Sequence, residues 1–180
     1  MPPLMIMLIR HAEKQPDDPP PFGINEAGAA DKHSLTPRGW QRAGALVGFF
    51  ASPSFPIVTP DVIYASAADS TESAGDDSKS LRPQETVAPL ARRLGLTVHA
   101  PFVVGKETEL ANRLESEDGF VLVAWEHKHI PLIAAALNAQ APKIWPDDQF
   151  DCVWILTRGD CGYNFREVNQ SLLDGDAPLC

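Results

Sequence analysis

The chain has 180 residues, of which 44% are hydrophobic and 22% are charged, as expected for a single domain (1–180) with a sizeable core. Its formal net charge of −9 argues against nucleic acid as a partner, because the phosphate backbone binds to a basic face. No window holds the ~18 apolar residues of a membrane span. The first apolar run also lacks the basic segment that precedes the apolar part of a signal peptide. We therefore expect a cytoplasmic protein without a membrane segment.

The three cysteines are Cys152, Cys161 and Cys180. Their number is odd and their spacing is unlike that of a metal site, so they do not indicate a disulfide framework or a metal centre. We expect free thiols in a reducing cytoplasm, with a Cys152–Cys161 disulfide across a hairpin as the alternative.

The first structural signal is the apolar run 4–9, LMIMLI, which predicts a central strand buried on both faces. Arg10 and His11 follow this strand directly. In open α/β sheets, ligands bind at the carboxyl ends of the parallel strands, so we expect both side chains at a binding site. The simpler alternative is a strand that reaches solvent at Arg10.

The segment 15–34 is rich in proline and predicts a loop, which is either a lid over the site or an ordinary surface excursion. A helix is predicted from Pro37 to about residue 50, with Thr36 as its N-cap. Its apolar residues recur at helical spacing and predict one buried face: Ala43, Leu46, Val47 and Phe50. Its glycines, at positions 39, 44 and 48, are expected to let it lie close against the sheet.

A second strand is predicted at 61–66, and a polar, mobile insertion at 67–79. The next helix opens within 80–86, with Pro83 at its first position and Arg82 beside its N-terminus. The helix dipole disfavours a cation there, and a bound anion would relieve that conflict. Arg82 is therefore a candidate anion-binding residue.

Several further elements are predicted in the second half of the chain. They are a short strand at 96–98, a helix at 107–114, a strand at 120–125, a helix from 131 to 137, and an antiparallel pair of strands at 152–157 and 163–168. The strand 120–125 ends at Glu126 and His127. It repeats the pattern of an apolar strand, a basic residue and a helix, so we expect His127 at the same sheet edge as His11.

In their order and spacing, these blocks resemble the histidine phosphatase superfamily, the phosphoglycerate-mutase-like proteins. The matching blocks are Leu8-Ile9-Arg10-His11, Leu35-Thr36-Pro37-Arg38-Gly39, Ile63-Tyr64-Ala65-Ser66, Arg82-Pro83-Gln84-Glu85-Thr86, and the late strand that ends in His127. The resemblance covers roughly residues 4–137. It implies an α/β fold, a three-layer α/β/α sandwich with a mostly parallel central sheet and an antiparallel edge.

The resemblance also implies a role for each matching residue. His11 would be the nucleophile that forms a covalent phosphohistidine, and Arg10 and Arg82 would clamp the phosphoryl oxygens. His127 would stabilise the transferring group. Guanidinium groups suit this chemistry, because they are permanently charged and present paired donors. No metal or other cofactor is expected, since a site at His127, Glu126 and His129 would lack a fourth ligand.

A general acid should protonate the leaving oxygen, and in the family a carboxylate commonly does so. We expect Glu107 or Glu109 to serve, with Glu13 next. Glu126 ranks lower, because in a continued strand it would point to the sheet face opposite His127. Two features depart from the family pattern: many members carry glycine in place of Glu126, and the insertion 67–79 lengthens the connection to Arg82.

The expected function is a metal-independent phosphatase that acts on a small phosphomonoester or on a phosphorylated protein side chain. The alternatives are a phosphoglycerate-type mutase and a catalytically silent phosphate-ligand sensor or interaction domain. The expected partner is a phosphorylated substrate, not nucleic acid or a membrane. The sequence does not specify an oligomeric state.

Overall fold

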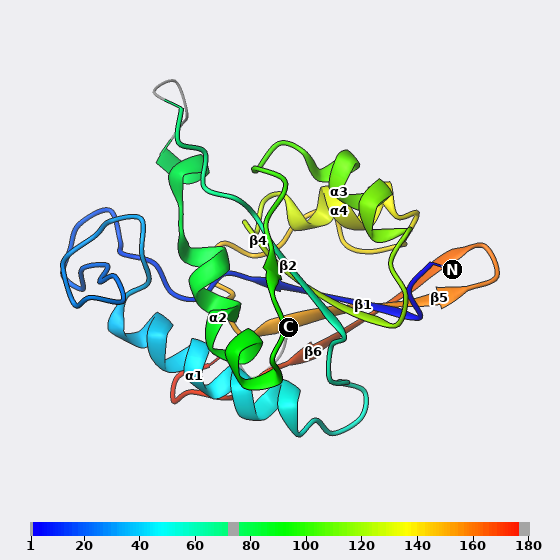
Figure 1. Ribbon diagram of the computed structural model, residues 1–180, viewed down its shortest axis with the longest axis horizontal. Coiled ribbons are helices and arrows are strands. Elements are labelled where there is room, and N and C mark those ends of the chain that lie inside the picture. Colours follow the sequence, from blue (N-terminus) through cyan, green and yellow to red (C-terminus); the bar gives the residue numbers. More distant parts are fainter. Residues whose placement is uncertain (1, 72–75, 177–180) are drawn as a thin grey trace.

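The computed structural model describes residues 2–71 and 76–176. Its elements are β1 (Met5–Arg10), α1 (Pro37–Ala51), β2 (Val62–Ala65), the 3₁₀ turn η1 (Asp76–Lys79), α2 (Arg82–Leu94), β3 (Val98–His99), α3 (Glu107–Leu114), β4 (Phe120–Trp125), α4 (Ile130–Ala136), β5 (Cys152–Gly159) and β6 (Gly162–Asn169). Within this part of the chain, the strands form one six-stranded sheet in the order β3-β2-β4-β1-β5-β6 (Figure 1).

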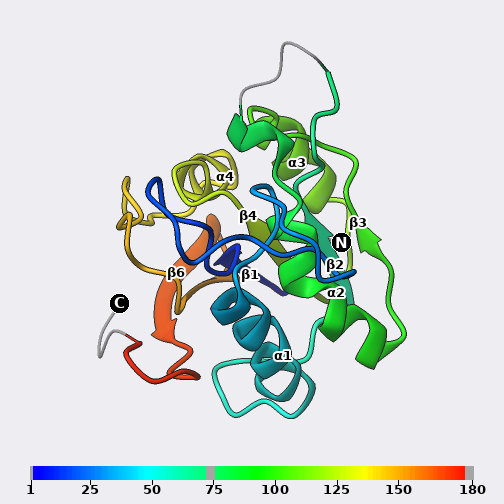
Figure 2. The ribbon, with the colours of Figure 1, turned by 90° about the vertical axis from the view of Figure 1, so that its left-hand side faces the viewer.

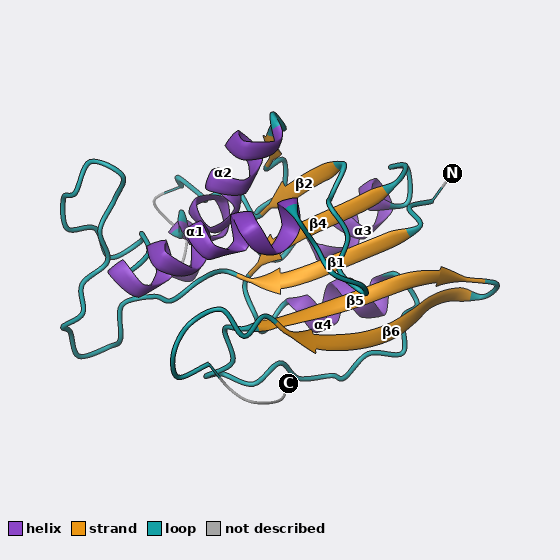
Figure 3. Cartoon of the chain, turned by 90° about the horizontal axis from the view of Figure 1, so that it is seen from below, coloured by secondary structure: helices purple, strands orange, loops and turns teal. Residues whose placement is uncertain are grey.

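The sheet is parallel through β3, β2, β4 and β1, whereas β5 is antiparallel to β1 and to β6. In Figure 3 the arrowheads of β1, β2 and β4 accordingly point the same way. Helices α1 and α2 cover one face of the sheet, and α3 and α4 cover the other. The predicted three-layer sandwich with an antiparallel edge is confirmed.

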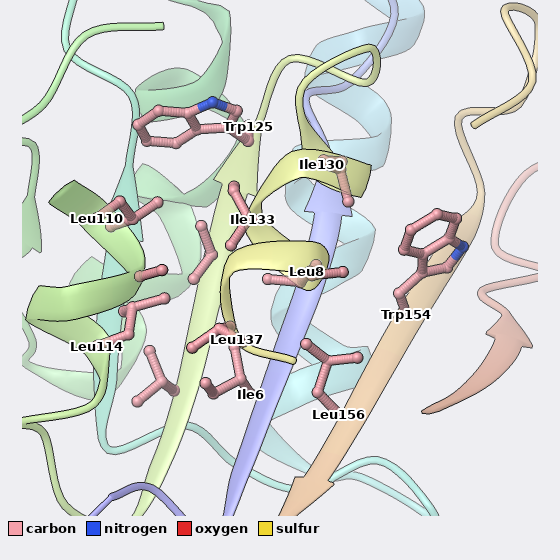
Figure 4. Close-up of a cluster of buried hydrophobic side chains, with 14 of the residues drawn as sticks. Ile6, Leu8, Leu110, Leu114, Trp125, Ile130, Ile133, Leu137, Trp154 and Leu156 are labelled. Carbon is pink, nitrogen blue, oxygen red and sulfur yellow. The ribbon is translucent and has the colours of Figure 1, made fainter. Parts of the chain in front are cut away.

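The central strand β1 is buried on both faces, as its uniform apolar run predicts. Ile6 and Leu8 belong to the core cluster under α3 and α4, which Figure 4 shows. Met7 and Ile9 belong to the cluster under α1 and α2. Because successive side chains of a strand point to opposite faces, one strand supplies the centre of both cores.

Helix α1 begins as predicted, with the Thr36 side chain accepting a hydrogen bond from the Gly39 N–H. A Cβ at Gly39 would lie 2.6 Å from the carbonyl oxygen of Glu13, so the close approach expected of the glycines is confirmed there. It is wrong for Gly44 and Gly48, whose Cβ positions have no neighbour within 4 Å.

The expectation of free thiols is confirmed for Cys161 and wrong for Cys152, and the alternative of a Cys152–Cys161 disulfide is wrong. Cys152 is disulfide-bonded, and Cys161 is an exposed free thiol, so the two do not pair across the hairpin. Cys180 lies outside the described residues.

Part of the predicted mobile insertion, residues 72–75, also lies outside the described residues, and η1 occupies its end at 76–79. Among the residues that are described, no helix has the length and apolar character of a membrane span.

Candidate active site

The carboxyl ends of β1, β2 and β4 meet at one edge of the sheet, the side that faces the viewer in Figure 2. The strand ends are held together there, because the His11 N–H donates to Trp125 O at 3.0 Å and the Ser66 N–H to Ala124 O at 3.3 Å. The same edge contains a small cavity. It is lined by His11, Lys14, Ser66, Ser80, Arg82, Pro83, Val104 and Glu126.

His11 is buried and has a defined ring orientation. Its Nδ1 lies 2.7 Å from the carbonyl oxygen of Ala12, which can only accept, so Nδ1 carries the proton and Nε2 keeps its lone pair. Burial, followed by the charges of Arg82 and Arg10, lowers the pKa of His11 well below its ordinary value. The ring is therefore neutral at pH 7, and Nε2 is available as a nucleophile.

The segment after His11 is tied to the start of α2 through one side chain. The Ala12 N–H donates to the hydroxyl of Thr86 at 2.8 Å, and this hydroxyl donates to the carbonyl oxygen of Arg82 at 2.7 Å. The relay fixes the segment that follows His11 relative to the helix that carries Arg82.

Arg10 is buried beside His11. Its Nη1 donates to the carbonyl oxygens of Asp147 at 2.5 Å and Gln149 at 3.3 Å, and its guanidinium lies 3.6 Å from the ring centre of Phe150. Burial lowers the pKa of Arg10 to about 10, so it stays charged at neutral pH. Its Nε is buried without a hydrogen-bond partner among the described residues. A buried N–H of a cation is normally paired, so this one is ready for an anionic ligand.

Arg82 is the first residue of α2 and is also buried. Its Nε donates to the hydroxyl of Ser80 at 2.7 Å, which holds the guanidinium against the cavity that contains His11. Arg10 and Arg82 both lower the pKa of His11, so the two cations lie close to the imidazole. The site thus places a neutral imidazole beside two positive charges.

His127 lies two residues beyond the end of β4 and contacts two carboxylates. Its Nε2 lies 2.8 Å from Asp147 Oδ1, and its Nδ1 lies 2.7 Å from Glu126 Oε1. The second contact is close but is not a hydrogen bond, because Nδ1 is buried without an aligned hydrogen-bond partner among the described residues. His127 lies near enough to His11 to lower the pKa of His11. All four residues predicted for phosphate chemistry therefore gather at one sheet edge.

The low rank given to Glu126 assumed that the strand continues through it. Strand β4 ends at Trp125, so the chain turns there and the alternation of faces no longer applies. Glu126 instead lines the cavity with His11 and Arg82. Asp147, which contacts His127, was not singled out in the sequence at all, since it lies in a polar loop without a motif.

The other carboxylates considered as proton donors have different surroundings. Glu13 binds Arg42 at 2.7 Å and Arg38 at 3.2 Å, and Glu109 pairs with Lys106 on the surface. Glu107 is buried and does not line the cavity.

The Oε1 atom of Glu107 accepts hydrogen bonds from the Gly105 N–H at 2.8 Å and from Trp125 Nε1 at 3.0 Å, and it lies 3.0 Å from His129 Nδ1. These contacts attach Glu107 to β4 and to the turn before α4. Its assignment as proton donor stays a prediction.

The loop 15–34 contributes none of the residues that line the cavity. Across residues 2–71 and 76–176, no three His, Cys, Asp or Glu side chains are grouped so as to hold a metal ion.

No protein-family model matches this sequence, and no curated protein is similar to it at a significant level. Solved structures do match the fold. A phosphoserine phosphatase mutant from Entamoeba histolytica, in complex with phosphoserine, superimposes with a TM-score of 0.53 at 12% sequence identity, over 93% of this chain and 97% of that chain. A protein from Nakamurella multipartitia, described as a candidate phosphohistidine phosphatase SixA, matches with a TM-score of 0.52 at 15% identity, over 90% and 92% of the two chains.

Both neighbours are members of the histidine phosphatase superfamily. The chain has the histidine phosphatase fold. The resemblance inferred from the sequence is confirmed at this level. The fold is shared over more than nine-tenths of this chain in the Entamoeba match.

Proposed function

We propose that this chain is a metal-independent phosphatase that hydrolyses a phosphomonoester through a phosphohistidine on His11. The observation that carries the proposal is a neutral, buried His11 beside two buried guanidinium groups, with Arg10 Nε lacking a protein partner among the described residues. A phosphoryl group would satisfy that N–H and would balance the charge of both arginines.

In the first step, Nε2 of His11 attacks phosphorus and the bond from phosphorus to the leaving oxygen breaks. The leaving group takes the electron pair of that bond and a proton from the general acid, for which Glu107 stays the candidate, and the phosphoryl group stays on Nε2. Arg10, Arg82 and His127 donate hydrogen bonds to the three equatorial oxygens, where charge is greatest in the transition state. The two guanidinium groups supply the positive charge that metal ions supply in many other phosphoryl-transfer enzymes.

In the second step, water attacks phosphorus on the side opposite His11 Nε2. The P–N bond breaks, its electron pair returns to the imidazole, and inorganic phosphate leaves after the attacking water has given a proton to solvent. The hydrogen bond from Nδ1 to Ala12 O holds the ring in one orientation through both steps. The same residues therefore serve the formation and the hydrolysis of the intermediate.

Phosphoserine and phosphohistidine appear in the descriptions of the two structural neighbours. For this chain we propose the broader class, a small phosphomonoester or a phosphorylated protein side chain. The cytoplasmic location stays part of the proposal, but the disulfide at Cys152 removes the support that free thiols gave it.

A second candidate function is a silent sensor of phosphate ligands. The observation that favours it is the pair of carboxylates, Glu126 and Asp147, on His127, because negative charge near the phosphate would slow its transfer.

The test is hydrolysis of phenyl phosphate by the wild type and by His11→Ala, with a chelator present and vanadate as competitor. An aryl phosphate is chosen because phenolate departs without a strong general acid, so the assay does not depend on Glu107. Chelator-resistant turnover that vanadate inhibits and His11→Ala abolishes supports the proposal. Turnover that persists in His11→Ala refutes it, and vanadate binding without turnover favours the sensor.

A further inference from the structure

His127 lies between two carboxylates that differ in solvent exposure. The Glu126 side chain, at Nδ1, is 13% exposed, whereas the Asp147 side chain, at Nε2, is 84% exposed. One partner is thus fixed within the protein, and the other lies in solvent and is free to leave. Nδ1 therefore faces a permanent partner, whereas the partner of Nε2 can be replaced by a ligand.

We propose that Glu126 is the positioning residue of His127: it holds the ring at Nδ1 and directs Nε2 to the transferring phosphoryl group. Asp147 occupies the Nε2 position until a phosphoryl oxygen replaces it. This inference rests on the proposed phosphatase function and assigns two residues to it.

The surroundings of Glu126 suit this role. Its Oε2 accepts a hydrogen bond from the Lys128 N–H at 2.9 Å, so the carboxylate cannot rotate freely. Burial alone would raise the pKa of Glu126, but the contact with His127 and the charge of His129 lower it below its ordinary value. Glu126 is therefore ionised at neutral pH and acts on His127 as a fixed negative charge.

The position of Nε2 follows from that arrangement. Nδ1 lies 2.7 Å from the buried Glu126 carboxylate, and Nε2 makes the one hydrogen bond of the ring among the described residues, to Asp147 Oδ1 at 2.8 Å. A phosphoryl oxygen at the place of Asp147 Oδ1 would accept the same Nε2–H. The backbone oxygen of Asp147 also accepts a hydrogen bond from Arg10. Asp147 therefore contacts two of the residues proposed to bind the phosphoryl group, Arg10 and His127.

A purely structural role for Glu126 would be to close the turn before α4 through the Lys128 N–H. Glu126→Gln separates the two roles. The amide oxygen of the glutamine can still accept the hydrogen bond from the Lys128 N–H, but the negative charge beside His127 is lost. Asp147→Asn is the matched control, since it makes the same chemical change at the other nitrogen of the same ring.

The experiment measures kcat and KM for phenyl phosphate and the inhibition constant of vanadate. Glu126→Gln is expected to lower kcat about 10-fold or more with little change in KM, because the lost interaction acts on the transition state. Asp147→Asn is expected to lower both KM and the vanadate inhibition constant, because a neutral amide oxygen competes for Nε2 more weakly than a carboxylate and repels the anionic ligand less. Proton–nitrogen correlation spectra of the His127 ring give a second readout, in which the Nδ1 signal is expected to move in Glu126→Gln.

Wild-type kcat in Glu126→Gln together with an unchanged ring spectrum would overturn the proposal. A wild-type spectrum that shows no proton on Nδ1 of His127 would also overturn the proposal. This second outcome does not depend on the folding of any variant. If the wild type hydrolyses nothing, the proposed phosphatase function fails, and the ring spectra still decide whether Glu126 holds His127.

Discussion

The C-terminal segment is fixed to the core through Asp176, and we predict that Asp176→Asn destabilises the protein. One oxygen of this carboxylate lies 2.6 Å from Arg42 Nη2 and 3.2 Å from Arg38 Nη2. The other accepts from the N–H groups of Leu172 at 2.9 Å and Leu173 at 3.0 Å. The Asp176 side chain is only 5% exposed, so solvent screens these contacts weakly.

The magnitude follows from the pKa of Asp176. Burial alone would raise it, but the hydrogen bonds from Arg42 and from two backbone N–H groups lower it from 3.8 to about 2. That difference corresponds to about 2 kcal/mol of folding free energy at neutral pH. Arg42 keeps Glu13 as a partner in the variant, which holds the loss below that of a fully unpaired buried cation.

The assay is urea and thermal unfolding of the wild type and Asp176→Asn, with the exposed neighbour in Asp174→Asn as control. A loss of about 2 kcal/mol lowers Tm by roughly 4–8 °C for a chain of this length. Because the folded-state pKa is depressed, this stability is fully present above pH 3.8 and disappears as the pH falls toward about 2. Equal stability of Asp176→Asn and Asp174→Asn at pH 7 would refute the reasoning. So would a difference in unfolding free energy between the wild type and Asp176→Asn that does not become smaller in acid.

Three further predictions concern the site. Thr86→Val leaves the Ala12 N–H unpaired and is expected to cost about 1–3 kcal/mol in urea unfolding; an unchanged midpoint would contradict the relay. Phe150→Ala removes the ring under Arg10 and is expected to weaken vanadate inhibition roughly 3- to 10-fold, whereas an equal inhibition constant would show that the ring is dispensable. The lowered pKa of His11 is expected to keep its Nε2 unprotonated at pH 6.5, the ordinary pKa of histidine, in the nitrogen chemical shifts of the ring, and a half-protonated ring at that pH would contradict it.

The features that could be predicted from the sequence are those that depend on local pattern. The uniform apolar run of β1 indicated a strand buried on both faces, and Pro37 after Thr36 marked the start of α1. Arg10 and His11 could be placed at a sheet edge because polar residues directly follow a central strand. These signals work because backbone geometry and burial act on neighbouring residues.

Other features were missed because distant segments create them. Arg42 is 1% exposed on a helix face predicted to be apolar, since Glu13 and Asp176 approach it from far along the chain. Glu126 lines the cavity because β4 ends at Trp125, so the alternation of side chains between the two sheet faces does not apply to Glu126.

In the sequence by itself, hydrophobic periodicity predicted the strands and helices, whereas the layered sheet and the grouping of Arg10, His11, Arg82 and His127 were implied by the resemblance to the histidine phosphatase superfamily. Only the tertiary structure decided which carboxylates reach His127, because a long loop carries Asp147 to it and no pattern encodes where a loop returns. Charge interactions depend on distance and burial, and both exist only after the chain has folded.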